Sequence, residues 1–532
     1  MDIRIGRAVP VAALALLAAA ACTDPTVAPK STVTGANIWA DPTAYESYIA
    51  KLYGGLILTS QAGPNENCDK CGDIRGIDEG FSEYLRLYWY LQEVPTDEAV
   101  IGWNDAGLPE LNRHNWDANN SMVNAMYYRI FFQVALANEF LRQTTLATLD
   151  SRGVTASLKA QIQNYRAEAR FLRALAYAHG VDLFGPIPLI TENDPVGGAP
   201  PQQATRTELY DYVVSELTSL RDSLPAPGAT SYGRATPAAA DMLLAEMYLN
   251  AEVYTGTPHY DLAVTAAASA ITASGASLNP VFQDNFTADN NLSPELIFVA
   301  AQDGVHTQTW GGMTFLVHAG CGGSMQASWF GMDYCWGGYR LKQQVYRLFD
   351  TVNDSRAAFF YVGGTTGQTD SVIDIGSFSS GTAAPKFTNM KSDGINHGSQ
   401  LGMIDTDFPI FRLAEAYLIY AEANIRGGGG SGATALGYLN ALRERAFGDA
   451  THDFAALPAV DTILAERARE LMFEAKRRTD LIRFGVFTGG TYLWAWKNNT
   501  PGGSAISANL ALYPIPANEM AANPNLTQNP GY

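Results

Sequence analysis

Two stretches of the sequence combine large aromatic side chains with amides and acids, which is a combination that suits sugar binding. Trp103-Asn104-Asp105 follows the acidic element Thr96-Asp97-Glu98. Residues 310–339 are rich in glycine and carry Trp310, Trp329, Phe330, Tyr334, Trp336 and Tyr339. Flat rings on a loop can stack on the apolar face of a sugar, while Asn, Asp and Arg bond its hydroxyls. The candidate ligand-binding residues are therefore Trp103, Asn104, Asp105, Trp310, Trp329, Tyr334, Trp336 and Tyr339. The alternative for any single ring is that it packs inward and closes a long loop.

Four cysteines lie in the body of the chain, at Cys68, Cys71, Cys321 and Cys335. Four cysteines allow three disulfide pairings. The local pairing, Cys68–Cys71 with Cys321–Cys335, closes the shortest loops. The alternative is a zinc site of four thiolates, because Cys68-x-x-Cys71 has the spacing of zinc ligands. The wide spacing of the other two cysteines argues against zinc, and an exported protein favours disulfides.

Signatures of catalysis are missing from the sequence. It contains no Gly-x-Ser-x-Gly, no His-Glu-x-x-His, no phosphate loop and no Gly-x-Gly-x-x-Gly after a predicted strand. The seven histidines are scattered, and no spacing singles out two carboxylates as an acid and a base. We therefore expect no catalytic residue, no metal and no cofactor.

The densest charged element runs from Glu466 to Gly485. Glu466, Glu470 and Glu474 recur every four residues and would share one face of a helix over 461–478. Arg467 and Arg477 could form ion pairs with that face. This pattern predicts a salt-bridged helix that holds neighbouring loops in place. The alternative is a site for an anion.

Helical patterns dominate the segments that must position these residues. One pattern begins after Asp41-Pro42, and others cover 121–146, 165–179, 206–224, 236–254, 258–273, 341–350, 408–426, 433–447 and 461–478. Residues 60–80, 275–340 and 362–406 have the composition of loops, with one short apolar strand at Leu296–Ala300. The last fifty residues are expected to be irregular.

Three of the predicted helices share one spacing of small and large apolar residues. The spacing is that of the second helix of a tetratricopeptide hairpin, where small residues let helices approach closely. It occurs at Ala167-x3-Phe171-x2-Ala174, Ala240-x3-Leu244-x2-Met247 and Ala416-x3-Tyr420-x2-Ala423. The intervals between these helices are irregular, and ordinary helix packing is the alternative explanation.

The composition of the chain limits the classes of protein to which it can belong. The chain has 532 residues, 47% of them hydrophobic and 17% charged, which is enough apolar material for a large core. Its net charge of −18 and the lack of a basic stripe argue against a nucleic-acid partner.

The N-terminus has the features of an export signal. Arg4 and Arg7 precede a short apolar run that ends in Ala19-Ala20-Ala21, directly before Cys22. The run is too short to span a membrane. We expect residues 1–21 to be a lipoprotein signal peptide, Cys22 to be the lipidated residue, and residues 22–36, rich in Thr and Pro, to be a flexible tether. The alternative is cleavage after an Ala-x-Ala site, which would leave a free thiol.

Several of these segments together resemble the SusD/RagB family of nutrient-uptake lipoproteins. The resemblance covers nearly the whole mature chain in the expected order. It rests on Glu466-Arg467…Glu470…Glu474-Ala-Lys-Arg477…Asp480-Leu-x-Arg483-Phe-Gly485, Leu512-Tyr-Pro-Ile-Pro516…Asn523–Tyr532, Arg166–Ala174 with Leu183–Leu189, Arg412-x-Ala-Glu415…Glu422-Ala, and Tyr438-Leu-Asn-x-Leu-Arg443-x-Arg445-Ala. The chain departs from the family at Ala475, where Gly is usual, at Arg478, where an aromatic residue is common, and at Ala19 in the lipidation signal.

The resemblance implies a mostly helical SusD-like fold. Several tetratricopeptide-like helix pairs would pack against an irregular, loop-rich half with few short strands. A single domain would span 37–532, with the irregular ligand-binding region at about 275–406 inserted between helical parts. Ligand would bind at positions that correspond to Trp103-Asn104 and to residues 310–339.

The resemblance also implies a function. Family members are lipid-anchored proteins of the Gram-negative outer membrane, exposed at the surface, that bind a nutrient, typically an oligosaccharide. They deliver it to a SusC-like TonB-dependent transporter and are not enzymes. Two alternatives make different predictions. A hydrolase would cleave the glycan that it binds, and a protein-interaction scaffold of the envelope would bind no small ligand.

Overall fold

The computed structural model describes residues 38–61, 63–64, 71–360 and 369–532. These fall into two units, one ending at Tyr48 and the other, which we call the main unit, beginning at Ile49. In the first unit, Trp39 of the short helix η1 (Ile38–Ala40) packs on two tyrosine rings. Its ring centroid lies 5.2 Å from that of Tyr45 and 5.4 Å from that of Tyr48. The predicted signal peptide (1–21), tether (22–36) and lipidated Cys22 lie outside the described residues. The single domain over 37–532 stays a prediction.

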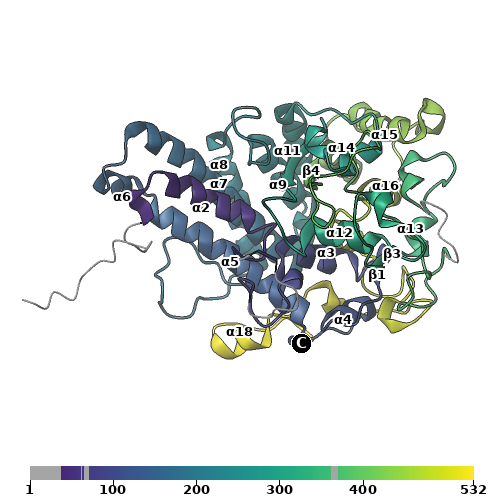
Figure 1. The fold of residues 1–532 in the computed structure, drawn as a ribbon, viewed down its shortest axis with the longest axis horizontal. Helices are drawn as coiled ribbons and strands as arrows, with labels where there is room; N and C mark the ends of the chain where they lie inside the picture. Colours follow the sequence, from purple (N-terminus) through teal and green to yellow (C-terminus); the bar gives the residue numbers. More distant parts are fainter. Residues whose placement is uncertain (1–37, 62, 65–70, 361–368) are drawn as a thin grey trace, which may run out of the picture. The chain divides into compact units, whose positions relative to one another are not determined.

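Helices form most of the main unit, as the sequence predicted (Figure 1). The longest are α5 (Ser121–Gln143) and α7 (Ala156–Leu183), which pack on each other. Their starts are set by side chains that accept backbone N–H groups, Asn120 for α5 and Thr155 for α7. The main unit also contains α3 (Tyr84–Glu93), α4 (Leu108–Arg113), α6 (Leu146–Ser151), α8 (Arg206–Leu220), α9 (Pro237–Leu249), α10 (Ala251–Thr255), α11 (Tyr260–Ser274), α15 (Gly432–Phe447) and α18 (Ala517–Ala522), and α2 (Thr43–Gly54) precedes them.

Consecutive helices pack in pairs at small buried residues. Helix α7 packs on α8, α9 on α11, and α14 (Leu413–Ala423) on α15. The small members of the shared spacing are all buried, namely Ala167, Ala174, Ala240, Ala416 and Ala423. Figure 1 shows α5, α7 and α8 on one side of the main unit, and α12 (Gly312–Gly320), α13 (Gln343–Tyr346), β1 and β3 on the other.

Two short antiparallel pairs of strands join distant parts of the chain. Strand β1 (Ala99–Ile101) pairs with β3 (Tyr339–Leu341), with Ile101 opposite Tyr339. Strand β2 (Leu296–Ala300), at the predicted position, pairs with β4 (Phe408–Arg412). The predicted helix over 408–426 was wrong at its start, because Pro409 disfavours a helical Phe408 and β2 supplies backbone partners. Helix α14 begins only at Leu413.

The predicted helix over 461–478 was also wrong, since it is broken. Helix α16 ends at Leu471 and α17 spans Arg477–Arg483. Between them Phe473 and Ala475 adopt left-handed backbone angles, with φ of 63° and 59°. A glycine would adopt that angle without the strain that a Cβ brings, which gives a physical reason for the usual glycine at position 475. The Phe473 N–H donates to Glu98 Oε2 at 2.8 Å, and this bond holds the break in place.

Two other predictions were wrong, one inside residues 275–340, which were expected to be irregular, and one just after them. Helix α12 (Gly312–Gly320) lies within it, and all of its residues are buried. A helix that is buried on every side has no polar face, so its sequence shows no amphipathic period. The helix predicted over 341–350 is reduced to the single turn α13.

A network of buried charges connects these elements. Arg412, at the end of β4, lies 2.8 Å from Glu295, 2.7 Å from Glu470 and 2.7 Å from Glu474, measured between side-chain nitrogen and oxygen atoms. Lys386 adds an ion pair to Glu474 at 2.5 Å. All five side chains are almost completely inaccessible to solvent. Each charge therefore depends on its partners in place of water.

A second set of arginines completes the network. Arg356 bonds Asp354 at 2.8 Å and Glu466 at 2.7 Å, and Arg445 bonds Glu295 at 2.7 Å and also Glu470. We call these groups the buried ion network: Glu295, Asp354, Arg356, Lys386, Arg412, Arg445, Glu466, Glu470 and Glu474. The predicted structural role of the glutamate face is confirmed.

The predicted partners of that face were wrong. Arg467 pairs with Asp480 at 2.7 Å, and Arg477 forms a two-pronged pair with Asp97 at 2.7 Å. The break after Leu471 turns Arg477 away from the face of α16. The face pairs with one local cation, Arg469 of α16, which lies 2.5 Å from Glu466. Its other cations come from positions 356, 386, 412, 443 and 445, which no local spacing connects to α16.

We predict that Arg412→Met destabilises the fold by about 3–5 kcal/mol, because three buried carboxylates lose a partner. Unfolding in urea measures the change. The matched control is Lys159→Met, whose ammonium pairs with the exposed Asp150. It is expected to change the free energy of unfolding by less than about 1 kcal/mol. Equal effects of the two substitutions would contradict the structural role of the network.

A second prediction concerns acid. Burial alone would raise the pKa of Glu466, but Arg356 and Arg469 outweigh it and hold the pKa at about 2. A depressed pKa adds stability above the unfolded value of 4.5, and that stability is lost as the pH falls toward 2. The wild type should therefore exceed Glu466→Gln in free energy of unfolding at neutral pH. The gap should shrink, by up to about 3 kcal/mol, between about pH 5 and about pH 2. A gap that is independent of pH would count against this pairing.

Candidate ligand-binding site

The pairing of β1 with β3 brings the two predicted aromatic stretches together. Trp103 follows β1 and Trp336 precedes β3, and their ring centroids lie 6.2 Å apart at an interplanar angle of 50°. Trp310, just before α12, lies 6.2 Å from Trp336 on another side. The three tryptophans are each half-buried. Rings that are more than two hundred positions apart in the sequence thus form one partly exposed group.

Tyr334 and His318 extend this group. Tyr334 is 43% exposed, and its ring lies 6.3 Å from that of Trp336. The buried His318 ring stacks on Trp336 at 4.8 Å, and its Nδ1 lies 2.8 Å from the Tyr334 carbonyl. Burial lowers the pKa of His318, so a neutral ring supports Trp336. We call Trp103, Trp310, Tyr334 and Trp336 the aromatic cluster.

Arg86 is a residue of this site that the sequence analysis missed. Its guanidinium lies 3.8 Å from the Phe81 ring centroid and 5.9 Å from that of Trp103. It donates to the Trp310 carbonyl at 2.9 Å and to the Tyr90 hydroxyl at 2.9 Å. A cation packed among rings in this way fixes their positions. Arg86 lies on a helix whose apolar period gave no sign of this role.

Glu83 joins the two helices beneath the cluster. Its carboxylate accepts the N–H groups of Leu85 and Arg86 at the start of α3, and that of Gly312 at the start of α12. Burial raises its pKa to about 7, against the opposing effect of these hydrogen bonds. Figure 1 shows α3, α12, β1, β3 and α4 close together in this part of the main unit.

A disulfide between Cys321 and Cys335 holds the loop next to Trp336. It links the end of α12 to the segment before β3, where the N–H of Trp336 also donates to the His318 carbonyl at 2.9 Å. Cys71 is disulfide-bonded as well, and Cys68 lies outside the described residues. The Cys321–Cys335 bond uses two of the four thiols that a zinc site would need. Within the described ranges, no group of three or more metal-binding side chains is assembled.

Two of the candidate aromatic residues do not belong to the aromatic cluster. Tyr339 is completely buried, donates its hydroxyl to the Leu316 carbonyl at 2.9 Å, and packs on Trp89 and Phe473. It forms part of the core, as do its neighbours Arg340 and Leu341, and it offers no open surface to a ligand. Trp329 is 39% exposed, but no ring contact connects it to the cluster in the described part of the chain. Asn104 is exposed beside Trp103, and Asp105 is half-buried.

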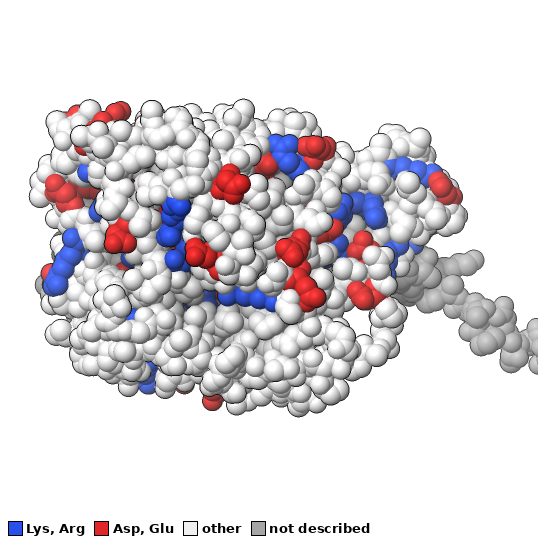
Figure 2. All heavy atoms as spheres, turned by 180° about the vertical axis from the view of Figure 1, so that it is seen from behind, with Lys and Arg blue, Asp and Glu red and all other residues white. Residues whose placement is uncertain are grey.

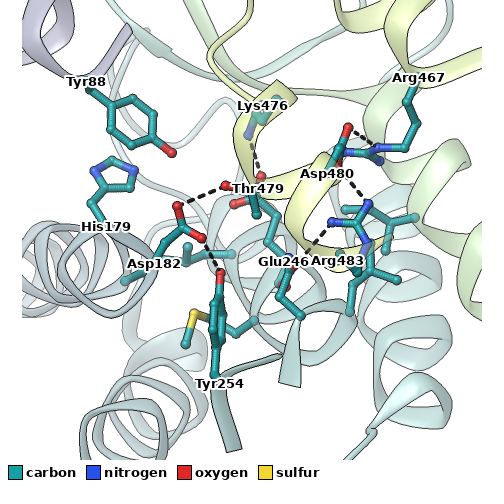
Figure 3. A pocket seen from close by; sticks show the side chains of 16 residues that line it. Tyr88, His179, Asp182, Glu246, Tyr254, Arg467, Lys476, Thr479, Asp480 and Arg483 are labelled. Carbon is teal, nitrogen blue, oxygen red and sulfur yellow. Dashed lines mark hydrogen bonds and ion pairs between the residues drawn. The ribbon is translucent and has the colours of Figure 1, made fainter. Parts of the chain in front are cut away.

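A separate hollow of about 40 Å³ lies between α7, α9 and α17 (Figure 3). Its polar groups bond one another: Asp182 accepts from Thr479 at 2.9 Å and from Tyr254 at 3.1 Å, and Arg483 pairs with Asp480 at 2.7 Å. Burial lowers the pKa of His179 to about 3, so this ring is neutral. Such mutual pairing indicates a structural role for the hollow.

Two features of the described residues concern charge and membrane-spanning helices. On the face drawn in Figure 2, acidic and basic side chains are interspersed, and the described residues there form no continuous basic stripe. Among the described helices, none has the length and apolar character needed to cross a bilayer.

Comparison with protein families gives two matches along the chain. A model described as the SusD family matches residues 361–532. A second model, described as "Starch-binding associating with outer membrane", matches residues 86–249. The chain is 32% identical to the starch-binding protein SusD of Bacteroides thetaiotaomicron, over 92% of each chain. It is 28% identical to a SusD-like protein of Bacteroides ovatus, over 69% of this chain and 66% of that one.

Solved structures share the fold. Surface glycan-binding protein A from Bacteroides thetaiotaomicron, in complex with laminarihexaose, aligns with a TM-score of 0.69 at 21% identity, over 91% of this chain and 98% of that one. A SusD superfamily protein from the same species also aligns with a TM-score of 0.69, at 19% identity, over 92% and 99%. At these identities the likeness establishes the fold, and the predicted mostly helical SusD-like class is confirmed.

Proposed function

This chain belongs to the SusD family, and we propose on that premise that it is a glycan-binding protein without catalytic activity. It binds an oligosaccharide at the aromatic cluster and passes it to a SusC-like TonB-dependent transporter. The observation that carries this proposal is the convergence of Trp103, Trp310 and Trp336 from three separate loops. Each ring keeps part of its surface open to solvent.

The chemistry of the cluster fits a sugar. Three indole rings at tilted angles offer apolar faces in different directions, which suits the apolar face of a pyranose ring or the curve of a short glycan. The exposed amide of Asn104 can bond hydroxyl groups beside Trp103. The rings are already held by Arg86, His318 and a disulfide, so binding would order few side chains and lose little entropy.

An α-glucan is the ligand class with the most support. The relative that is 32% identical over 92% of the chain is named a starch-binding protein. The complex with laminarihexaose belongs to a protein that shares only the fold. We therefore choose maltoheptaose as the first probe and laminarihexaose as the comparison.

Outer-membrane association agrees with the family model that matches residues 86–249. We further propose that a lipid on Cys22 anchors the protein and that residues 22–36 tether it at the cell surface. A lipid followed by a flexible segment would let a lid move over a transporter while remaining attached. The transporter partner follows from family membership.

We predict that the mature chain binds maltoheptaose and that Trp336→Ala weakens this binding about tenfold or more, because the central ring of the cluster is lost. Trp103→Ala should act in the same direction. Isothermal titration calorimetry measures both. Trp329→Ala is the matched control, since this exposed ring lies outside the cluster, and it should leave the affinity unchanged.

Three other outcomes are informative. Unchanged affinity in Trp336→Ala would show that the ligand binds elsewhere. Release of reducing sugar from the probe over time would indicate a hydrolase. Failure to bind any glycan in a broad panel, with transporter co-purification intact, would favour an envelope scaffold without a small ligand.

The anchor gives a separate prediction. Mass spectrometry of the protein purified from Gram-negative membranes should find an N-terminal Cys22 that carries a diacylglyceryl group. Cys22→Ser should remove the modification and release the protein into the soluble fraction. A mature chain that starts after Ala21 with a free thiol would instead support ordinary cleavage.

A further inference from the structure

A second hollow adjoins the aromatic cluster through Trp103. It has a volume of about 220 Å³ and opens to solvent, so it is smaller than a typical small-molecule site of about 300 Å³ or more. Trp103 lines it together with Trp496, Arg113, Asp374, Asn104 and Asn499. We call it the Trp496 hollow. The loops that contain Gly102 and Ile375 both line the hollow and lie very close together. A Cβ on Gly102 would lie only 2.5 Å from the Ile375 carbonyl oxygen.

Trp496 is fixed in an unusual backbone conformation. Trp496, Asn498 and Asn499 have φ angles of 67°, 54° and 52°, although none of them is glycine. Asn tolerates this conformation, but for Trp496 it costs about 1–2 kcal/mol, and strain of this kind concentrates at functional sites. The Trp496 indole N–H donates to the Val372 carbonyl at 2.9 Å, so the half-buried ring is held in one orientation.

Buried neighbours stabilise this turn. Lys497 donates to the Tyr492 carbonyl at 2.8 Å, and its ammonium lies 4.0 Å from the Trp494 ring centroid. His114, at the end of α4, accepts the Asn498 N–H at its Nδ1 at 3.3 Å, and its Nε2 donates to the Pro95 carbonyl at 2.7 Å. Burial lowers the pKa of His114 to about 3, so this bridging ring is neutral. The hollow is therefore a preformed feature of the fold.

Polar groups at the rim complement the two indole rings. Arg113 is exposed and forms no ion pair with any described residue. Asp374 is exposed and accepts the Gly376 N–H at one carboxylate oxygen, at 2.8 Å. Asn104 and Asn499 are also exposed. A guanidinium, a carboxylate and two amides supply both donors and acceptors, as the vicinal hydroxyls of a neutral sugar require.

We propose that the Trp496 hollow is a second sugar subsite for the same oligosaccharide. A longer glycan would run from Trp336 across Trp103, which the two sites share, to Trp496. Short glycans would occupy the aromatic cluster alone. This inference rests on the proposed function, and it assigns a length preference that the cluster by itself does not provide.

The test compares maltotriose with maltoheptaose by calorimetry on the full mature chain. Trp496→Ala should weaken maltoheptaose binding about five- to tenfold and change maltotriose binding by less than about twofold. Trp336→Ala should weaken both. Trp496→Phe keeps a flat ring and should retain most of the affinity for maltoheptaose. Thermal unfolding of each variant verifies that the turn still folds.

A variant at the rim avoids the strained turn. Asp374→Ala should weaken maltoheptaose binding about threefold or more and leave maltotriose binding unchanged. Its matched control is Asp393→Ala, because Asp393 is also exposed and likewise accepts the N–H two residues ahead, at 2.8 Å. Asp393 lines neither site, so its loss should change neither affinity.

The outcomes separate this inference from the proposed function. A wild type that binds neither probe overturns the α-glucan ligand and the subsite together. Equal binding of maltoheptaose by the wild type, Trp496→Ala and Asp374→Ala overturns only the subsite. Equal weakening of both probes by Trp496→Ala also overturns it, because the ring would then act on the cluster.

Discussion

The burial of charge is the constraint on which the rest of this structure depends. Arg412, Arg356 and Lys386 lie out of contact with water, and the Arg445 side chain is 4% exposed. Each compensates for its lost hydration mainly through carboxylates on other segments. The carboxylates that pair with these cations are far apart in the sequence, from Glu295 to Glu474. An arrangement that misplaced any one of them would leave an unpaired charge in the interior. The buried ion network therefore favours a single register of β2, β4, α15 and α16 over its alternatives.

This constraint extends to the ligand site through a short series of contacts. The break after α16 presents the Phe473 N–H to Glu98 and the Arg477 guanidinium to Asp97. Both acids immediately precede β1, whose pairing with β3 places Trp103 beside Trp336. The acidic element and the late charged helix, which are nearly four hundred residues apart, together fix the position of the rings. Charges thus build the scaffold, while aromatic rings on loops form the partly exposed surface to which we assign ligand binding.

The same division appears among the polar groups near the aromatic cluster. Glu83, beneath the cluster, accepts three backbone N–H groups and caps a helix. The acids of the interior hollow are bonded to Thr479, Tyr254 and arginines. The groups that face solvent around Trp103 are indoles, amides, Arg113 and Asp374. Their arrangement offers apolar faces and hydrogen bonds along a path, which is what the recognition of an extended glycan requires.

The sequence by itself indicated most of the long helices, strand β2, the two aromatic stretches and, as one of the possible pairings, Cys321 with Cys335, because these depend on composition and periods within a few turns of chain. It did not reveal α12, since a helix buried on all sides has no amphipathic period, nor the break at Phe473, which a distant glutamate stabilises. The sequence does not distinguish Tyr339 from Trp336, since both are aromatic residues of the same glycine-rich stretch. Tyr339 nevertheless lies in the core, whereas Trp336 is half-buried. Only the tertiary structure decided which rings converge, that Arg86 lies beneath them, and that Trp496 joins them across Trp103. Contacts of that kind form between segments whose proximity depends on every other segment folding, so no local pattern records them.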